Sequence, residues 1–157
     1  MRSVRAVWAL RSALFVLFLT VALVFWGILM LGLSVFWRGE KLYWPTMRWP
    51  RLVIWSARVF CGVRYVVHGM HHLPTAAQRK SALVLAAKHQ STWETFAFPT
   101  LMPHPLAYVF KRELLYIPFF GWAMGRLDMI HIDRSKRTES WAKVAEQGKR
   151  LAAEGVW

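Results

Sequence analysis

One uncharged, apolar stretch at residues 12–37 sets the strongest limit on how this chain can fold. As a helix, its 26 residues would extend about 39 Å at roughly 1.5 Å per residue, enough to cross the hydrocarbon core of a bilayer. Signal peptides have shorter apolar segments and end in a small-residue cleavage site, which this stretch lacks. A buried core helix is the alternative, but the remaining chain is too small to enclose one. The stretch therefore predicts an uncleaved membrane helix.

A second segment, residues 46–60, combines apolar side chains with Arg48, Arg51 and Arg58. Basic residues beside aromatic ones are typical of an amphipathic helix in the headgroup layer of a membrane. Because basic residues follow the apolar stretch closely, the positive-inside tendency slightly favours the cytoplasm for its carboxyl side. A re-entrant hairpin with both ends on one side of the membrane fits the charges equally well.

The charge balance indicates the kind of partner. The formal net charge is +13, from 21 Lys and Arg against eight Asp and Glu, which favours an anionic partner. A lipid surface fits better than nucleic acid, because the basic residues cluster around the membrane segment as well as near the candidate site described below. We therefore expect membrane phospholipids as partners and no nucleic acid.

From Gly62 onward, short β-branched or apolar runs alternate with helical patterns. This alternation predicts an α/β fold with a largely parallel sheet and flanking helices. The expected strands are residues 63–68, 82–87, 106–110 and 129–132. The expected helices are residues 91–102, 113–124 with a break at Ile117-Pro118, and 135–153. Residues 1–62 would thus form a membrane anchor with an interfacial helix, and residues 63–157 an α/β domain.

The last four residues, Glu154-Gly155-Val156-Trp157, have the pattern of a helix end, a glycine stop and the first residues of a strand. A sheet that lacked this next strand would expose an unpaired edge. We therefore expect residues 63–157 to be the amino-terminal part of a truncated domain.

His89 and Glu94 are the candidate catalytic pair, five positions apart between an apolar run and a predicted helix. Histidine can accept a proton near neutral pH, and a nearby carboxylate can fix its tautomer and stabilise its charged form. Ser91-Thr92-Trp93-Glu94 is also a capping box, in which Ser91 caps the helix and Glu94 reaches back to the backbone. Both roles of Glu94 stay open, since a helix start can present its first turn to a site.

Three basic residues are candidates for binding a phosphate. Lys111 and Arg112 follow one predicted strand, and Arg134 follows the next, each ahead of a helix. Such positions suit phosphate binding, although solvated surface charge has the same appearance in a sequence.

Other reactive residues carry weaker signals. His68, His71 and His72 lack accompanying cysteines or a convincing carboxylate, so we expect a solvated loop and no metal site. Cys61 is the only cysteine, which excludes an intramolecular disulfide. No evident base lies beside it, and it is interpreted as a packing residue.

Three motifs together resemble the glycerolipid acyltransferase family. The first, His89-Gln-Ser-Thr-Trp-Glu94, resembles the family's H-x-x-x-x-D motif, with Glu in the Asp position. Residues 111–122 are similar to the stretch after the third strand of the 1-acylglycerol-3-phosphate acyltransferases. Ile130-His-Ile-Asp-Arg134 resembles the block whose arginine helps to hold the acceptor's phosphate. The family's E-G-T-R block would lie beyond Val156-Trp157 and is missing, as is a later block.

This resemblance implies transfer of a fatty acyl group from acyl-CoA or acyl-carrier protein to the sn-2 hydroxyl of 1-acylglycerol-3-phosphate, giving phosphatidate. His89 would be the general base and Glu94 would orient it, while Arg134, with Lys111 or Arg112, would bind the acceptor's phosphate. No cofactor besides the acyl thioester is implied.

The resemblance also implies a place in the cell, the bacterial inner membrane, with the catalytic part facing the cytoplasm. Two alternatives remain open. The chain could be an inactive membrane-bound fragment that lacks the E-G-T-R block, or an acyltransferase for another lysolipid such as lyso-ornithine lipid.

Overall fold

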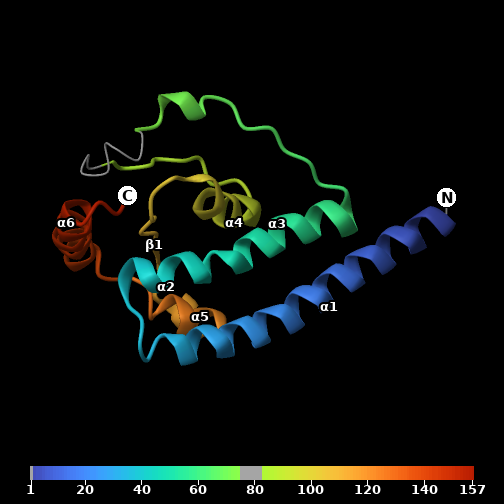
Figure 1. Ribbon diagram of the computed structural model, residues 1–157, viewed down its shortest axis with the longest axis horizontal. Helices are drawn as coiled ribbons and strands as arrows, with labels where there is room; N and C mark the ends of the chain where they lie inside the picture. Colours follow the sequence, from blue (N-terminus) through green and yellow to red (C-terminus); the bar gives the residue numbers. More distant parts are fainter. Residues whose placement is uncertain (1, 75–82) are drawn as a thin grey trace.

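A computed structural model describes residues 2–74 and 83–157 of the protein (Figure 1). In chain order its elements are α1 (Arg2–Leu33), α2 (Gly39–Thr46), α3 (Arg48–Cys61), η1 (Met70–His72), α4 (Thr92–Leu101), β1 (Val109–Lys111), η3 (Arg112–Tyr116), α5 (Phe120–Met124), β2 (Ile130–Ile132) and α6 (Arg137–Ala153).

The apolar amino-terminal stretch forms one long helix, α1, as predicted. Its segment Val4–Leu33 is long and apolar enough to cross a membrane, and only 11% of its most apolar window is buried inside the protein. The core helix of a soluble protein would have most of this surface covered. Helix α1 therefore leaves its apolar surface free for contact with lipid.

Helix α3 runs back along α1, so the two form a hairpin joined by α2 (Figure 1). At the closed end of the hairpin, the Thr46 hydroxyl donates to the Met30 sulfur at 3.4 Å. At the open end, the ring of Phe60 contacts Phe15, with ring centroids 6.4 Å apart. There the Arg11 guanidinium also donates to the Phe60 carbonyl at 2.6 Å. These contacts fix which parts of α1 and α3 lie side by side.

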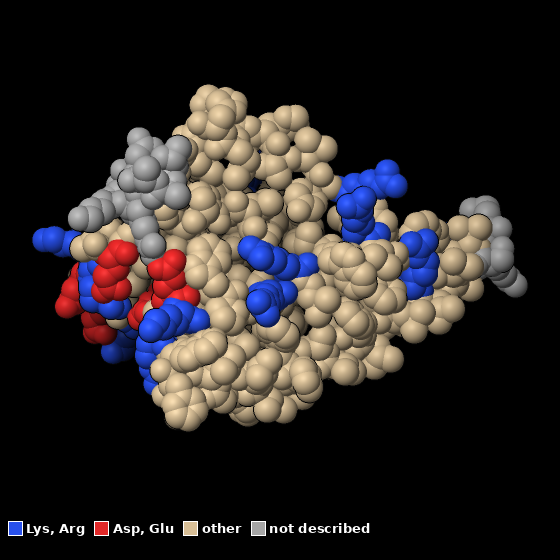
Figure 2. Space-filling view, viewed as in Figure 1, with Lys and Arg blue, Asp and Glu red and all other residues tan. Residues whose placement is uncertain are grey.

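Helix α3 confirms the predicted amphipathic helix. Val53 and Ala57 are buried, whereas Arg48, Arg51 and Arg58 are exposed. Figure 2 shows that the acidic side chains on the face drawn gather at the end of the molecule where α6 lies, while basic side chains also appear along α3 and near the amino-terminal end of α1. The hairpin therefore combines apolar and cationic surface, which suits contact with anionic lipid.

The strands β1 and β2 form a parallel pair in which Val109 is opposite Ile130 and Lys111 is opposite Ile132. This confirms an α/β fold with a partial parallel sheet and flanking helices, and it confirms strands close to the predicted residues 106–110 and 129–132. At the other edge of the β1 segment, the Trp157 N–H donates to the Pro105 carbonyl at 2.9 Å and the Ala107 N–H donates to the Trp157 carbonyl at 2.7 Å. The carboxyl-terminal residues thus pair like the start of a further parallel strand.

Two predicted strands are wrong for the residues that the structure describes. Residues 63–68 and 83–87 form no strand and follow irregular paths (Figure 1). β-branched residues favour a strand only where a neighbouring strand supplies hydrogen bonds, and the first of these segments begins instead by closing α3. Gly62 adopts a left-handed conformation there, at a φ of 72°, and the Val63 N–H donates to the Ala57 carbonyl at 3.2 Å. Ala82, the first residue of the second predicted strand, lies outside the described ranges, as do residues 75–81, which precede it.

The predicted helices are confirmed in α4, in η3 and α5 separated at Ile117-Pro118, and in α6. Helix α5 packs closely against α1 at Gly27. A Cβ atom on Gly27 would lie only 2.6 Å from the Phe119 Cβ, so the approach of the two segments requires glycine.

A buried tyrosine joins the hairpin to the α/β part. Tyr43 of α2 belongs to a core cluster with Leu42, Met47 and Leu127. Its hydroxyl oxygen accepts a hydrogen bond from the Leu106 N–H at 3.0 Å. Burial raises the pKa of Tyr43 to about 12, despite the opposing effect of this hydrogen bond, so the hydroxyl stays neutral. The hairpin is therefore attached to the segment that leads into β1.

Candidate active site

The start of helix α4 is built by its own side chains. Ser91 is the N-cap, and its hydroxyl accepts a hydrogen bond from the Trp93 N–H at 3.2 Å. Glu94 reaches back across the first turn, and its Oε2 and Oε1 atoms lie 2.9 Å and 3.2 Å from the Gln90 nitrogen. The Ser91 hydroxyl thus satisfies an N–H group that the beginning of a helix leaves without a partner, and Glu94 binds the backbone just before the cap. The capping role predicted from Ser91 to Glu94 agrees with this geometry.

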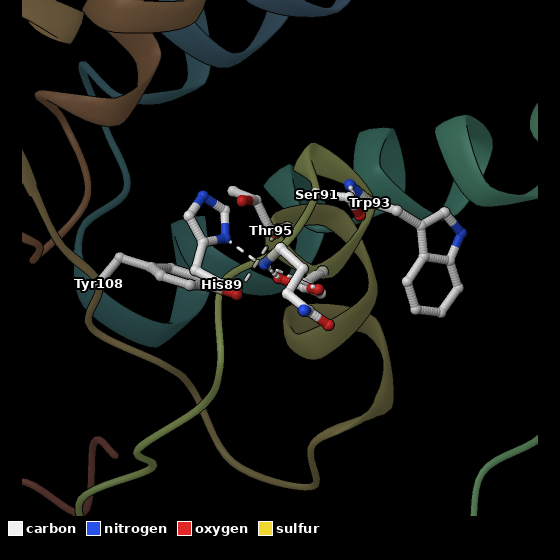
Figure 3. Close-up of polar contacts among 7 residues, drawn as sticks. His89, Ser91, Trp93, Thr95 and Tyr108 are labelled. Atoms are coloured by element: carbon white, nitrogen blue, oxygen red, sulfur yellow. Dashed lines mark hydrogen bonds and ion pairs between the residues drawn. The ribbon is translucent and has the colours of Figure 1, made fainter.

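The same carboxylate also holds the candidate base. His89 Nδ1 lies 3.1 Å from Glu94 Oε2 (Figure 3). The His89 side chain is 72% exposed and that of Glu94 only 21%, so the carboxylate lies beneath a ring that substrate can reach. A proton on Nδ1 donates to the carboxylate, which leaves Nε2 as the nitrogen able to accept a proton. The structure thus brings together the two residues that sequence spacing had paired.

The electrostatics of Glu94 favour the ionised form. Partial desolvation raises the pKa of Glu94, but hydrogen bonds from the backbones of Gln90 and Ser91, together with the interaction with His89, outweigh it and place the pKa below its ordinary value. Glu94 is therefore a carboxylate at neutral pH. In that form it can stabilise a positive charge on the imidazole.

An apolar pocket adjoins this turn of α4. It holds about 610 Å³ of empty space, its open mouth included, and its lining is almost wholly apolar. Trp26 and Met30 of α1 face it, as do Thr95 and Phe96 of α4 and Phe119 before α5. Because Thr95 directly follows Glu94, the pocket lies next to the His89–Glu94 pair.

The three predicted phosphate-binding residues gather at one edge of the sheet. Lys111 is the last residue of β1, Arg112 follows it, and Arg134 comes two residues after β2. Parallel strands end at the same edge, so these three exposed side chains share that edge. Within the described residues, no hydrogen bond or ion pair joins this edge to His89 or Glu94.

Cationic charge at this edge acts on its neighbours. Hydrogen bonds from Ser135, with the nearby charges of Arg112 and Lys136, lower the pKa of Asp133. Desolvation, with the charges of Lys143 and Arg112, lowers the pKa of His131. The cations account for only part of each shift, but that part favours the ionised Asp133 and the neutral His131, and the same charges would favour a bound phosphate.

The remaining histidines form no metal centre in the part of the chain that the structure describes. His71 and His72 lie in the exposed segment η1, with ring centroids 4.0 Å apart. Among the described residues, no three or more His, Cys, Asp or Glu side chains converge as a metal site would need.

Sequence reasoning missed one residue near the pair. The Tyr108 hydroxyl donates to the Thr95 carbonyl at 3.3 Å, and its ring lines the apolar pocket. The available signal was Pro99, four residues after Thr95, because a proline within a helix leaves one carbonyl without its usual donor.

Fold and site together define an α/β protein with a membrane-type helix and a histidine–carboxylate pair beside an apolar pocket. The model of the Acyltransferase family matches residues 64–157, and the chain belongs to this family.

Relatives with assigned names agree with this membership. The chain is 40% identical over 150 residues to the 1-acyl-sn-glycerol-3-phosphate acyltransferase of Pseudomonas aeruginosa, a match that covers 95% of this chain and 56% of the relative. It is 27% identical over 119 residues to the mouse 1-acyl-sn-glycerol-3-phosphate acyltransferase alpha, covering 76% of this chain and 40% of the relative. The Escherichia coli protein of the same enzyme name is 34% identical over 76 residues, covering 46% of this chain and 30% of the relative. The chain thus spans about half the length of these relatives or less. No solved structure matches it.

Proposed function

We propose that the protein transfers a fatty acyl group from a thioester to the sn-2 hydroxyl of 1-acylglycerol-3-phosphate and so forms phosphatidate. The observation that carries this proposal is the His89–Glu94 pair at the capped start of α4, next to an apolar pocket. Membership of the Acyltransferase family, and relatives named for this reaction, support the same chemistry.

His89 is the proposed general base. Its Nε2 accepts the proton of the acceptor hydroxyl as that oxygen attacks the thioester carbonyl, and Glu94 stabilises the resulting imidazolium through Nδ1–H. The tetrahedral intermediate then breaks its carbon–sulfur bond, and His89 returns the proton to the leaving thiolate. No acyl-enzyme is needed in this sequence. Cys61, at the end of α3, therefore has no part in it.

The two substrates have separate proposed binding groups. Arg134, with Lys111 and Arg112, binds the phosphate of lysophosphatidate at the carboxyl edge of the sheet. The apolar pocket beside α4 takes the fatty acyl chain. Acyl-CoA and acyl-carrier protein are both anionic, and a net charge of +13 favours either as the donor. The reaction requires no cofactor besides this co-substrate.

We place the protein at the inner membrane of a bacterium, with its catalytic part facing the cytoplasm. The exposed apolar surface of α1 and the cationic face of α3 favour attachment to a membrane that contains anionic lipid. Both proposed acyl donors are made in the cytoplasm, and the acceptor is a membrane lipid. The membrane phospholipids are therefore the proposed surroundings of the site.

The proposal predicts that His89→Ala reduces acyl transfer at least 100-fold, on the order of what loss of a general base costs. Protein in lipid nanodiscs receives acyl-CoA or acyl-carrier protein with lysophosphatidate, and both thiol release and phosphatidate are measured. His72→Ala, another exposed histidine, is the matched control and should keep full activity. Membrane association should be unchanged in both variants.

Retained turnover in His89→Ala would remove this residue from the mechanism. Thioester consumption only with lyso-ornithine lipid would change the acceptor and keep the chemistry. Absence of turnover with every donor and acceptor, in protein that is folded and membrane-bound, would favour the inactive fragment.

A further inference from the structure

Helix α4 contains a proline that breaks its internal hydrogen bonding. In an α-helix, the carbonyl of residue 95 accepts the N–H of residue 99. Residue 99 is a proline, which has no N–H to donate. The Thr95 carbonyl, one residue after Glu94, therefore lacks its helical donor. A tyrosine from another part of the chain takes that place, because the Tyr108 hydroxyl donates to the Thr95 carbonyl at 3.3 Å.

Tyr108 is itself attached to the sheet. It directly precedes β1, and its carbonyl accepts the Ile130 N–H of β2 at 2.9 Å. Figure 3 shows its side chain pointing from this segment toward the first turn of α4, on the side where His89 lies. Burial, with the neighbouring Tyr43, raises the pKa of Tyr108, so its hydroxyl keeps the proton that it donates. The tyrosine thus connects the sheet to the turn that holds the candidate base.

The bond acts on the same turn as the pair. Glu94 holds the Gln90 N–H at 2.9 Å and His89 Nδ1 at 3.1 Å, and Thr95 is the next residue along the helix. A shift of this turn would move the carboxylate relative to the imidazole. Since hydrogen-bond strength falls steeply with distance and angle, a small shift is enough to weaken the pair.

We propose that Tyr108 is a positioning residue for acyl transfer. Its hydroxyl replaces the hydrogen bond that Pro99 cannot make, and so fixes the turn of α4 on which Glu94 holds His89. The expected effect of Tyr108 on the rate of acyl transfer rests on the proposed function, whereas its expected effect on the first turn of α4 does not.

The direct test is Tyr108→Phe, which keeps the ring in the pocket wall and removes only the hydroxyl. We expect kcat to fall about fivefold to tenfold, the scale of one lost hydrogen bond. The KM values for donor and acceptor should change less than twofold, because the variant keeps the ring in the wall of the proposed acyl pocket and leaves the proposed phosphate-binding residues unchanged. Tyr116→Phe, at a tyrosine that is 69% exposed on η3, is the control and should leave kcat unchanged.

A second variant tests the mechanism by rescue. Pro99→Ala gives residue 99 an N–H that can bind the Thr95 carbonyl within the helix. Tyr108→Phe combined with Pro99→Ala should therefore recover most of the lost kcat. If Tyr108 acted only by packing, Pro99→Ala would not restore kcat. A double variant as slow as Tyr108→Phe would therefore overturn the proposal.

Hydrogen exchange gives a readout that does not depend on activity. The backbone amides of residues 96–98 bond to carbonyls in the first turn of α4, so their exchange reports on that turn. Exchange should accelerate in Tyr108→Phe and return toward the wild-type rate in the double variant. Unchanged exchange in folded Tyr108→Phe would overturn the proposal, as would faster exchange with an unchanged kcat. If the wild type transfers no acyl group, the proposed function fails, and the exchange rates still decide whether Tyr108 fixes the turn.

Discussion

At the scale of single residues, the two oxygens of Glu94 serve both the helix and the imidazole. They accept the Gln90 N–H and also face His89 Nδ1. From sequence, a capping role and a catalytic role were both open for this glutamate. The geometry makes them compatible, because the residue that begins the helix also fixes the ring. A test must therefore separate the charge of Glu94 from its hydrogen bonding.

Glu94→Gln makes that separation. The amide oxygen can still accept the Gln90 N–H, so α4 should keep its start, but a neutral group stabilises an imidazolium less well. We expect kcat to fall about 100-fold, measured by thiol release, with a nearly unchanged circular dichroism spectrum. Near-normal kinetics would show that Glu94 serves only as part of the cap.

The same variant should change how stability depends on pH. The pKa of Glu94 is lower in the folded protein than its ordinary value, so its contribution is fully present above the unfolded-state pKa and is lost as the pH falls through the folded-state value. Wild type should therefore unfold at a higher temperature than Glu94→Gln near pH 7, and the difference should disappear in acid. A difference that grows toward acid would contradict this assignment.

Arg134 is the residue on which phosphate recognition can be tested most directly. It is exposed at the edge where both strands end. Arg134→Ala should raise the KM for lysophosphatidate about tenfold with little change in kcat, since a charge-assisted contact to the bound lipid is lost. Lys149→Ala on α6 removes an exposed cation elsewhere and should leave KM unchanged. An unchanged KM in Arg134→Ala would assign the phosphate to another group.

At the scale of elements, local signals in the sequence were sufficient for the helices and insufficient for the sheet. Helix α4 was predictable because Ser91 and Glu94 determine its start within one turn. Residues 63–68 have strand propensity, but a strand also needs a partner that no local pattern specifies. The contact from Tyr108 to Thr95 spans 13 residues and depends on how the segment that leads into β1 lies against α4. The His89–Glu94 pair could thus be predicted from sequence, whereas the support beneath it could not.

The packing of α5 against α1 can be tested at a single glycine. In Gly27→Ala the new methyl group would lie 2.6 Å from the Phe119 Cβ, so the two segments must move apart. We expect a loss of about 1–3 kcal/mol in the free energy of unfolding, measured by denaturation in detergent micelles. Gly32→Ala in the same helix meets nothing within 4 Å and should be neutral or slightly stabilising. Equal effects of the two substitutions would show that helix propensity, and not packing, decides the outcome.

At the scale of the whole molecule, the register of the hairpin bears on how the protein meets the membrane. Thr46 lies beside Met30, and Phe60 lies beside Phe15. Arg51 and Arg58, which fall between Thr46 and Phe60, therefore run alongside the middle of α1. If α1 crossed the bilayer upright, these exposed arginines would be at the depth of the hydrocarbon, at a cost of about 2.5–3.5 kcal/mol each near the centre. A hairpin that lies within one leaflet avoids this cost, and the register favours it over a single span.

This arrangement predicts that the amino terminus and the α/β part lie on the same side of the membrane. Single cysteines, Val4→Cys at the start of α1 and Thr138→Cys on exposed α6, are introduced separately into a Cys61→Ser background. Inside-out and right-side-out vesicles are then treated with a membrane-impermeant maleimide. Both positions should be labelled in inside-out vesicles and protected in right-side-out ones, with equal labelling in detergent as the control.

Since an upright helix must place its two ends in different compartments, labelling of the two positions in opposite preparations would establish a single span. Labelling of both in inside-out vesicles alone would place the arginines of α3 among the cytoplasmic headgroups, where their charge stabilises binding to anionic lipid by about 1 kcal/mol each.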